Sequence, residues 1–148
     1  MQMYKDIFTN LQQLQGHGRW EFEYNNIVQC VFPVGRLKDI LPQEFVEEFN
    51  LDDDYLIGAE TIPANSTLDP HTDHIRKSNL LINVSESDAV IFHSNNGESE
   101  KHTFAPGEMF LINTQKMHGS TNGHDYDYKF LTLNTKLNYD KTKELFNV

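Results

Sequence analysis

Three side chains that could bind a metal ion stand out by type and spacing: His71, Asp73 and His118. His71 and Asp73 are two residues apart, and side chains two apart leave the same face of a strand. His118 lies 45 positions beyond Asp73 (118 − 73) and joins them if the chain returns as a β-sandwich. Two imidazoles and one carboxylate that leave other positions open form the facial triad of non-haem Fe(II) centres. The pattern therefore predicts a metal site at these three residues.

The other histidines fit ordinary roles better. His74 adjoins the motif but projects to the other face of a strand, so we do not expect it to be a ligand. We expect two histidines to flank a hairpin at Asn96-Gly97 and to face each other, with a structural or surface role. Two more lie in glycine-flanked loops, where we expect them to be solvated. These four are His93, His102, His17 and His124.

In the N-terminal third, residues 1–54, the sequence predicts a helix, a β-hairpin and a short helix. Apolar residues at helical spacing predict an amphipathic helix over 3–15. Alternation over 20–24 predicts a strand with one buried face, and 27–32 returns as its partner after a turn at Asn25-Asn26. Pro42 suits the first turn of the short helix that follows.

From Tyr55 the chain changes to short strands separated by turn signals. About eight strands fall between Leu56 and Thr135, with turns every 8–12 residues, which is typical of a sandwich or barrel. We therefore expect a mainly β fold, a double-stranded β-helix (jelly roll, cupin-like) with an N-terminal helical segment. A jelly roll places its second strand beside its seventh, which would bring His118 to His71 and Asp73. The polar tail from Tyr139 is expected to form a helical turn or to fray.

Length and charge limit the functions open to the chain. Its 148 residues suggest a single domain, with 55–136 as the jelly-roll core. The net charge of −10 argues against nucleic acid as a partner and leaves small molecules or peptides. Cys30 is the single cysteine, so no internal disulfide or cysteine-based zinc site is expected. No apolar stretch approaches the roughly 18 residues of a membrane span. With no signal peptide visible, we expect a cytoplasmic protein; its oligomeric state is left open.

A family resemblance adds to this. The chain resembles the 2-oxoglutarate- and Fe(II)-dependent dioxygenases, and is similar to their small prolyl- and aspartyl/asparaginyl-hydroxylase-like members. The likeness covers roughly residues 55–136. It rests on the His71-x-Asp73 pair with distal His118, on a basic residue that follows, and on three local stretches. These stretches are Ile62-Pro63 before the loop to His71, Asn79-Leu80-Leu81-Ile82-Asn83 after it, and the run from Pro106-Gly107 to Asn113.

The resemblance implies an enzyme that uses Fe(II), 2-oxoglutarate as cosubstrate and O2. It would hydroxylate a peptide side chain (prolyl or Asp/Asn) or a small molecule. His71, Asp73 and His118 would hold the iron. Lys129, 11 positions beyond His118 (129 − 118), would pair with the far carboxylate of 2-oxoglutarate, with Arg76 as the competing cation. Other donors to the cosubstrate would be Asn79, Tyr126 and Asn83.

Two readings from other classes stay open. The first is a cupin-like metal-binding protein that does not use 2-oxoglutarate. The second is a non-catalytic jelly-roll module with a binding or structural role, whose His-x-Asp is accidental. A zinc hydrolase could also use two histidines and one carboxylate, but the motif offers no general base.

Overall fold

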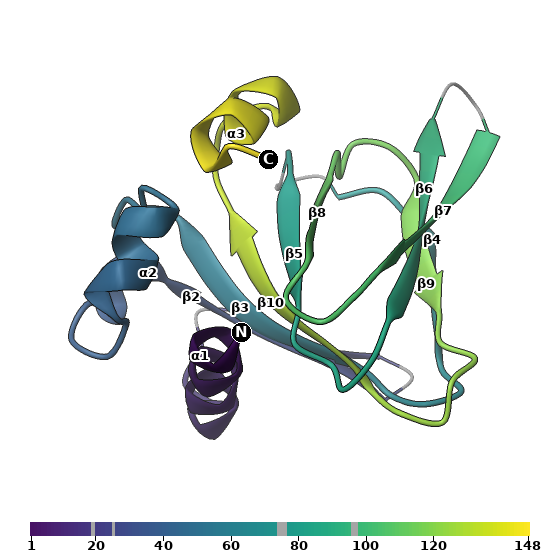
Figure 1. Cartoon of the computed structure of the whole chain (residues 1–148), viewed down its shortest axis with the longest axis horizontal. Helices are drawn as coiled ribbons and strands as arrows, with labels where there is room; N and C mark the ends of the chain where they lie inside the picture. Colours follow the sequence, from purple (N-terminus) through teal and green to yellow (C-terminus); the bar gives the residue numbers. More distant parts are fainter. Residues whose placement is uncertain (19, 25, 74–76, 96–97) are drawn as a thin grey trace.

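In the computed structural model, ten β-strands among the described residues form two antiparallel sheets that face each other (Figure 1). The structure describes residues 1–148 except 19, 25, 74–76 and 96–97. The larger sheet has six strands, and the order across it is β1-β2-β3-β10-β5-β8. Their bounds are β1 Trp20–Tyr24, β2 Ile27–Pro33, β3 Leu56–Ile62, β10 Tyr128–Asn134, β5 Asn79–Asn83 and β8 Met109–Ile112.

The smaller sheet has four strands in the order β4-β9-β6-β7. Their bounds are β4 Thr67–His71, β9 His118–Thr121, β6 Ala89–Asn95 and β7 Glu98–Phe104. From β3 to β10 the chain passes back and forth between the sheets, except that β6 and β7 are neighbours in the smaller sheet. The second of these eight strands, β4, pairs with the seventh, β9. This is the predicted double-stranded β-helix, and the predicted number of strands after Leu56 is confirmed.

The central strands of the six-stranded sheet carry buried apolar residues on both faces. On β5, Leu81 faces the interior between the sheets, where it packs with Ile91 and Phe130. Its neighbours Leu80 and Ile82 face the opposite side and pack in a second core under the helices. Burial on both faces explains why β5 reads as a continuous apolar run and not as an alternation.

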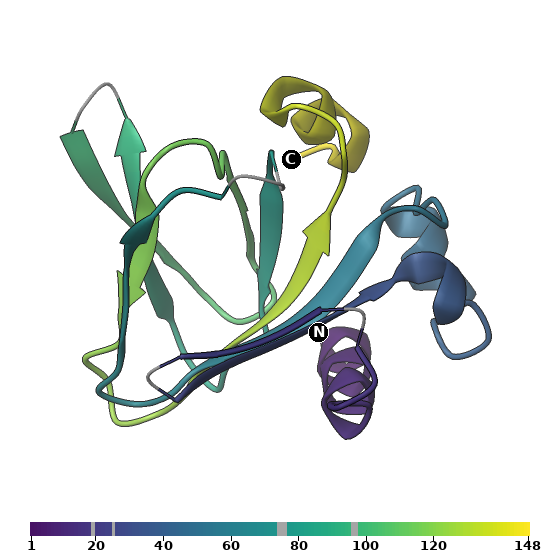
Figure 2. The same ribbon diagram turned by 180° about the vertical axis from the view of Figure 1, so that it is seen from behind.

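Three α-helices complete the fold. The first, α1 (Gln2–Gln13), lies on the face of the six-stranded sheet that is turned away from the smaller sheet (Figures 1 and 2). It buries a stripe at helical spacing that includes Ile7 and Leu11. A 3-10 turn (η1, Val34–Arg36) leads to α2 (Gln43–Glu48). The tail forms a full helix, α3 (Tyr139–Phe146), which the Asn138 side chain caps by accepting a hydrogen bond from the Lys141 N–H.

Two local expectations need comment. Phe22 on β1 is 41% exposed, so the hairpin does not bury this apolar side chain as the alternation predicted. The predicted turns at Asn25-Asn26 and Asn96-Gly97 include positions outside the described residues. Among the helices that the structure describes, none is long and apolar enough to cross a membrane.

Candidate metal centre

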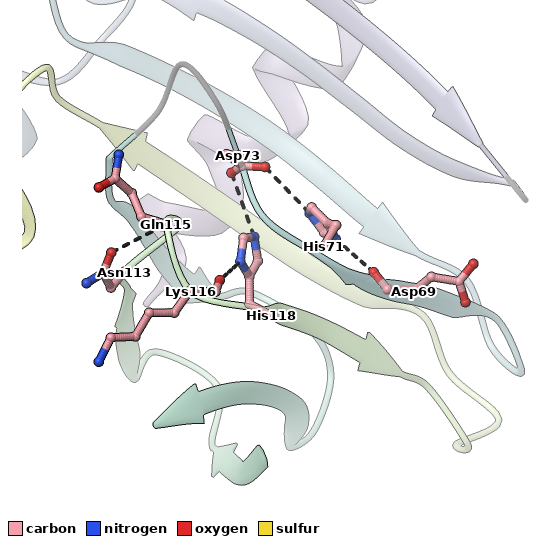
Figure 3. A network of polar contacts seen from close by, with 7 residues as sticks. All are labelled: Asp69, His71, Asp73, Asn113, Gln115, Lys116 and His118. Atoms are coloured by element: carbon pink, nitrogen blue, oxygen red, sulfur yellow. Dashed lines mark hydrogen bonds and ion pairs between the residues drawn. The ribbon is translucent and has the colours of Figure 1, made fainter. Parts of the chain in front are cut away.

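His71, Asp73 and His118 lie together at one end of the interior between the two sheets (Figure 3). His71 is the last residue of β4 and His118 is the first residue of β9, and the two are direct partners in the register of these antiparallel strands. Their ring centroids are 4.3 Å apart. Direct partners carry their side chains on the same face of a sheet, which brings both imidazoles to one point.

Each of these imidazoles is oriented by a backbone carbonyl two residues before it. His71 Nδ1 lies 2.8 Å from the Asp69 carbonyl oxygen, and His118 Nδ1 lies 2.9 Å from the Lys116 carbonyl oxygen (Figure 3). A carbonyl oxygen only accepts, so Nδ1 carries the proton in both rings. The lone pair is therefore on Nε2, and a hydrogen bond of this kind fixes the ring of a metal-binding histidine.

Asp73 is held by the loop between β8 and β9. Its backbone N–H donates to the Thr114 carbonyl oxygen at 2.8 Å. The Asp73 carboxylate then faces both rings, with Oδ1 3.6 Å from His71 Nε2 and Oδ2 3.7 Å from His118 Nε2. The prediction that His71 and Asp73 share a strand is wrong, because β4 ends at His71 and Asp73 follows in the loop.

The spacing of the three groups fits a shared metal ion. Their ligand atoms all lie within 4.8 Å of one another, and the two nitrogen–oxygen distances are too long for hydrogen bonds. Two ligands at about 2.1 Å from one ion are about 3.0–3.5 Å apart, close to what is found here. The Asp73 and His118 side chains are 14% and 7% exposed, but the His71 side chain is 35% exposed, so the site is only partly shielded from water. These residues could hold a metal ion.

An irregularity in β4 shapes this end of the strand. The register between β4 and β9 shifts between Leu68 and His71, where Asp69-Pro70 interrupts the pairing. Gly119, next to His118, allows the strands to approach, since a Cβ there would lie 2.6 Å from the Leu68 carbonyl oxygen. The bulge turns His71 back into register with His118, which is how such irregularities re-aim side chains near active sites.

A small cavity of about 30 Å³ opens beside His71 and His118. This is about the volume that one water molecule occupies in the liquid. Apolar side chains from both sheets form about half of its wall, and Glu60, Asn79 and Ser120 add polar groups. The apolar residues are Ile62, Leu68, Leu81, Ile91, Ile112 and Phe130. A metal ion at the triad would therefore face a small space of mixed polar and apolar lining, with room for about one water molecule.

The structure corrects two of the residues that the sequence suggested for cosubstrate binding. Lys129 and Tyr126 line a different hollow, on the outer side of the six-stranded sheet against α1. The reason is the alternation of β10: its neighbours Tyr128 and Phe130 face the interior, so Lys129 faces outward. The Tyr126 hydroxyl donates to the Asp88 carbonyl oxygen instead. Tyr128 takes the inward position, fully buried, and its hydroxyl lies 2.7 Å from His124 Nδ1.

Of the other suggested residues, only Asn79 lies beside the triad within the part of the chain that is described. It lines the small cavity with His71 and His118, and its Oδ1 is buried without a hydrogen-bond partner. Asn83 serves the fold, since its Nδ2 donates to the Phe104 carbonyl oxygen at 2.9 Å. Arg76 and His74 lie outside the described residues.

Sequence reasoning missed two features of the centre. Glu60 enters the cavity from β3, and the signal for this was a charged residue inside an otherwise apolar strand. Gly119 directly after His118 was a second signal, because a glycine within a strand often marks close backbone approach. Neither could be assigned to the site without knowing which strands are neighbours.

Comparison with solved structures supports the assignment of the fold. The chain is similar to an oxalate decarboxylase from Bacillus subtilis (12% identity, TM-score 0.57, 82% of this chain and 29% of that chain). It is also similar to the vicilin from Solanum melongena (12% identity, TM-score 0.56, 82% of this chain and 29% of that chain). A third similar structure is the plu4264 protein from Photorhabdus luminescens (15% identity, TM-score 0.52, 86% of this chain and 88% of that chain). No family model and no curated protein matches the sequence. At such identities the likeness concerns the fold alone.

The chain spans less than a third of the decarboxylase and vicilin chains, so it corresponds to one part of those proteins. Together, the topology and these neighbours identify a cupin-like double-stranded β-helix. Within that fold, His71, Asp73 and His118 make a constellation that could hold a metal ion.

Proposed function

We propose that this protein is an Fe(II)- and 2-oxoglutarate-dependent dioxygenase that hydroxylates a peptide side chain or a small molecule. The observation that carries the proposal is the triad, in which two imidazole Nε2 atoms face the two oxygens of one carboxylate. Two histidines and one carboxylate with open positions suit Fe(II). Bound iron would supply the oxidising chemistry with O2 and the keto acid.

The residues of the chain would perform three tasks. His71, Asp73 and His118 would hold the ion from one side, with both rings locked by the carbonyl oxygens of Asp69 and Lys116. The open side would face the small cavity between the sheets, which would have to widen to admit the cosubstrate. Asn79, which lines the cavity, would donate a hydrogen bond from its amide Nδ2 to an oxygen of the cosubstrate, because the cosubstrate's oxygens only accept.

Of the two candidate cations, we propose Arg76 as the one that would bind the far carboxylate of 2-oxoglutarate. The sequence suggested two candidates, and Lys129 faces the outer hollow beside α1. Arg76 lies three positions beyond Asp73, and a guanidinium can grip a carboxylate with two parallel hydrogen bonds. We propose a small molecule or peptide as the primary substrate and no nucleic acid, in keeping with the charge of −10.

A second candidate is a cupin-like metal enzyme or binding protein that does not use 2-oxoglutarate. One observation favours it: among the described residues that line the cavity, none is a lysine or arginine, and Glu60 adds a carboxylate. The similar fold of an oxalate decarboxylase agrees with this reading without establishing it.

An anaerobic titration separates the two. Fe(II) and then 2-oxoglutarate are added to the metal-free protein, and the visible charge-transfer band of an iron-chelated keto acid is recorded. The proposal expects the band in the wild type and its loss in Asp73→Ala and His118→Ala. Bound iron without a band would favour the second candidate. If neither iron nor the keto acid binds, the enzyme proposal is wrong and a non-catalytic module remains.

A further inference from the structure

Each strand of the four-stranded sheet contributes one potential metal ligand to a row of side chains, in which each residue is the pairing partner of the next. His71 on β4 pairs with His118 on β9, His118 pairs with His93 on β6, and His93 pairs with Glu100 on β7. Directly opposed residues share a face of the sheet. The four side chains therefore point to the interior side of this sheet, and only two of them belong to the triad.

Beyond the triad, the row continues into a second group of ligand types. Glu100 and His102 are two residues apart on β7, which places His102 on the same face as Glu100 and His93. The Glu100 Oε2 atom lies 3.8 Å from His102 Nε2, and the His93 and His102 ring centroids are 6.3 Å apart. One strand thus offers a carboxylate and an imidazole, and its neighbour offers a second imidazole, which are the same ligand types as at the triad.

The state of the His93 ring points to a missing partner. The His93 Nε2 atom is buried without a hydrogen-bond partner. Buried polar atoms in folded proteins nearly always have a partner, so an unmade contact at His93 Nε2 needs an explanation.

We propose that His93, Glu100 and His102 form a second binding site for a first-row transition metal ion of the Zn²⁺ type. Imidazole and carboxylate are ligands that Zn²⁺ takes in proteins. An ion about 2.1 Å from a ring nitrogen is about 3.3 Å from the ring centroid. Around a tetrahedral ion two imidazoles have ring centroids about 5.4 Å apart, so the 6.3 Å between His93 and His102 would shorten by about 1 Å when an ion binds.

Aromatic packing alone is the competing explanation. The His102 ring lies against Phe110, with centroids 4.3 Å apart and planes at 31°. In the described part of the chain, only the triad has three ligand atoms within 4.8 Å of one another. The ligand atoms of His93, Glu100 and His102 are farther apart than those of the triad, and a bound ion would bring them closer together. The Glu100 side chain is 49% exposed, so it can rotate onto an ion without disturbing the core.

Counting bound metal tests the second site without any substrate. Metal-free wild type is dialysed against buffered Zn²⁺ and its zinc content is measured. A triad variant (His71→Ala with Asp73→Ala) and a hairpin variant (His93→Gln with His102→Gln) are treated alike. We expect two ions in the wild type, one in each variant, and none when the variants are combined. The second site does not depend on the proposed dioxygenase function, because the two counts are separate.

One ion in the wild type and none in the triad variant would overturn the second site. So would an unchanged zinc content in the hairpin variant. His17→Gln, which removes an exposed histidine outside both groups, is the control and should bind two ions. If the hairpin variant fails to fold, Glu100→Gln replaces it, since that side chain is half exposed; it should weaken zinc binding to the triad variant at least tenfold, and unchanged affinity would contradict the site.

Discussion

At Gly119 a single hydrogen atom takes the place of a side chain and lets β4 approach β9 beside the metal ligands. A methyl group there would lie 2.6 Å from the Leu68 carbonyl oxygen and 3.1 Å from the Pro70 nitrogen. Both contacts are with backbone, which cannot move aside as a flexible side chain can. Gly119 therefore sets the distance between His71 and His118 as directly as the histidines themselves.

We predict that Gly119→Ala weakens metal binding at the triad at least tenfold, because β4 must shift and carries His71 with it. A Zn²⁺ titration of the hairpin variant, in which only the triad remains, measures this. Gly123→Ala is the matched control, since a Cβ there meets no atom within 4 Å. Equal affinities in the two alanine variants would show that the close approach does not matter to the site.

Lys129 allows a prediction of no effect. Because its side chain lies in the outer hollow beside α1, Lys129→Ala should leave the affinity for 2-oxoglutarate unchanged within about twofold. The anaerobic band measures this affinity, and Arg76→Ala should lower it at least tenfold. A loss of affinity in Lys129→Ala would mean that the side chain reaches the interior after all.

The contrast between the triad and Lys129 shows what the sequence can predict at the residue scale. His-x-Asp is a local signal, and the distal histidine follows from the strand count. The orientation of Lys129 depends instead on which alternate residues of β10 face the interior. In this strand Phe130, Leu131 and Leu133 are all buried. Since both faces of this strand are apolar, alternation does not reveal which residues point inward.

Among the elements, β10 carries an unusual polar side chain toward the interior. Thr132 is fully buried and its hydroxyl has no hydrogen-bond partner in the structure. Thr142 in α3 is equally buried, but its hydroxyl lies 2.8 Å from that of Thr135. The two threonines therefore form a matched pair for testing what an unmade hydrogen bond costs.

We predict that Thr132→Val raises the free energy of unfolding by about 1 kcal/mol, since it removes a desolvated hydroxyl that gains nothing in return. Thr142→Val should lower it by about 1–3 kcal/mol, because the Thr135 hydroxyl and the Leu137 carbonyl oxygen each lose a hydrogen bond to Thr142. Urea denaturation of both variants provides the values. A destabilised Thr132→Val would indicate that its hydroxyl is bonded in solution, for instance to a buried water molecule.

Helix α1 is held to the outer face of the six-stranded sheet by its apolar stripe. Leu11 is fully buried there, whereas Gln12 is exposed. Leu11→Ala should cost about 2–5 kcal/mol of stability through the cavity it leaves. Gln12→Ala should stay within about 0.5 kcal/mol of the wild type. Thermal unfolding of the two variants checks this, and similar stabilities would mean that α1 is loosely attached.

The elements themselves were largely predictable, and their ends were not. The spacing of Ile7, Phe8 and Leu11 identified α1, and alternation with turn signals identified the strands after Leu56. The prediction for the end of β4 was wrong, because the sequence pattern extended this strand to Asp73 and the strand ends at His71. The bulge at Asp69-Pro70 and the hydrogen bond from Asp73 to Thr114 decide this end, and both depend on a loop 40 residues away.

For the whole molecule, charge is the dominant property. Twelve basic and 22 acidic side chains leave a net charge of −10 on 148 residues. An exposed pair such as Lys38–Asp53 offsets little of the resulting repulsion. We predict that raising NaCl from 10 to 150 mM increases the melting temperature by a degree or more, because the screening length falls from about 30 to about 8 Å. Scanning calorimetry measures this, and a lower melting temperature in salt would contradict it.

The pairing of β3 with β10 has a consequence for the order in which the protein assembles. Tyr128 pairs with Ile62 and Asn134 with Leu56, so the central pair of the larger sheet joins segments more than 60 residues apart. During synthesis, β3 can pair with β2 as soon as both are made, but its other edge stays unpaired until β10 follows. His71 and Asp73 likewise cannot meet His118 until that residue has been made. In a nascent chain the candidate metal site should therefore close late, because it depends on contacts between distant segments, which are slow to form.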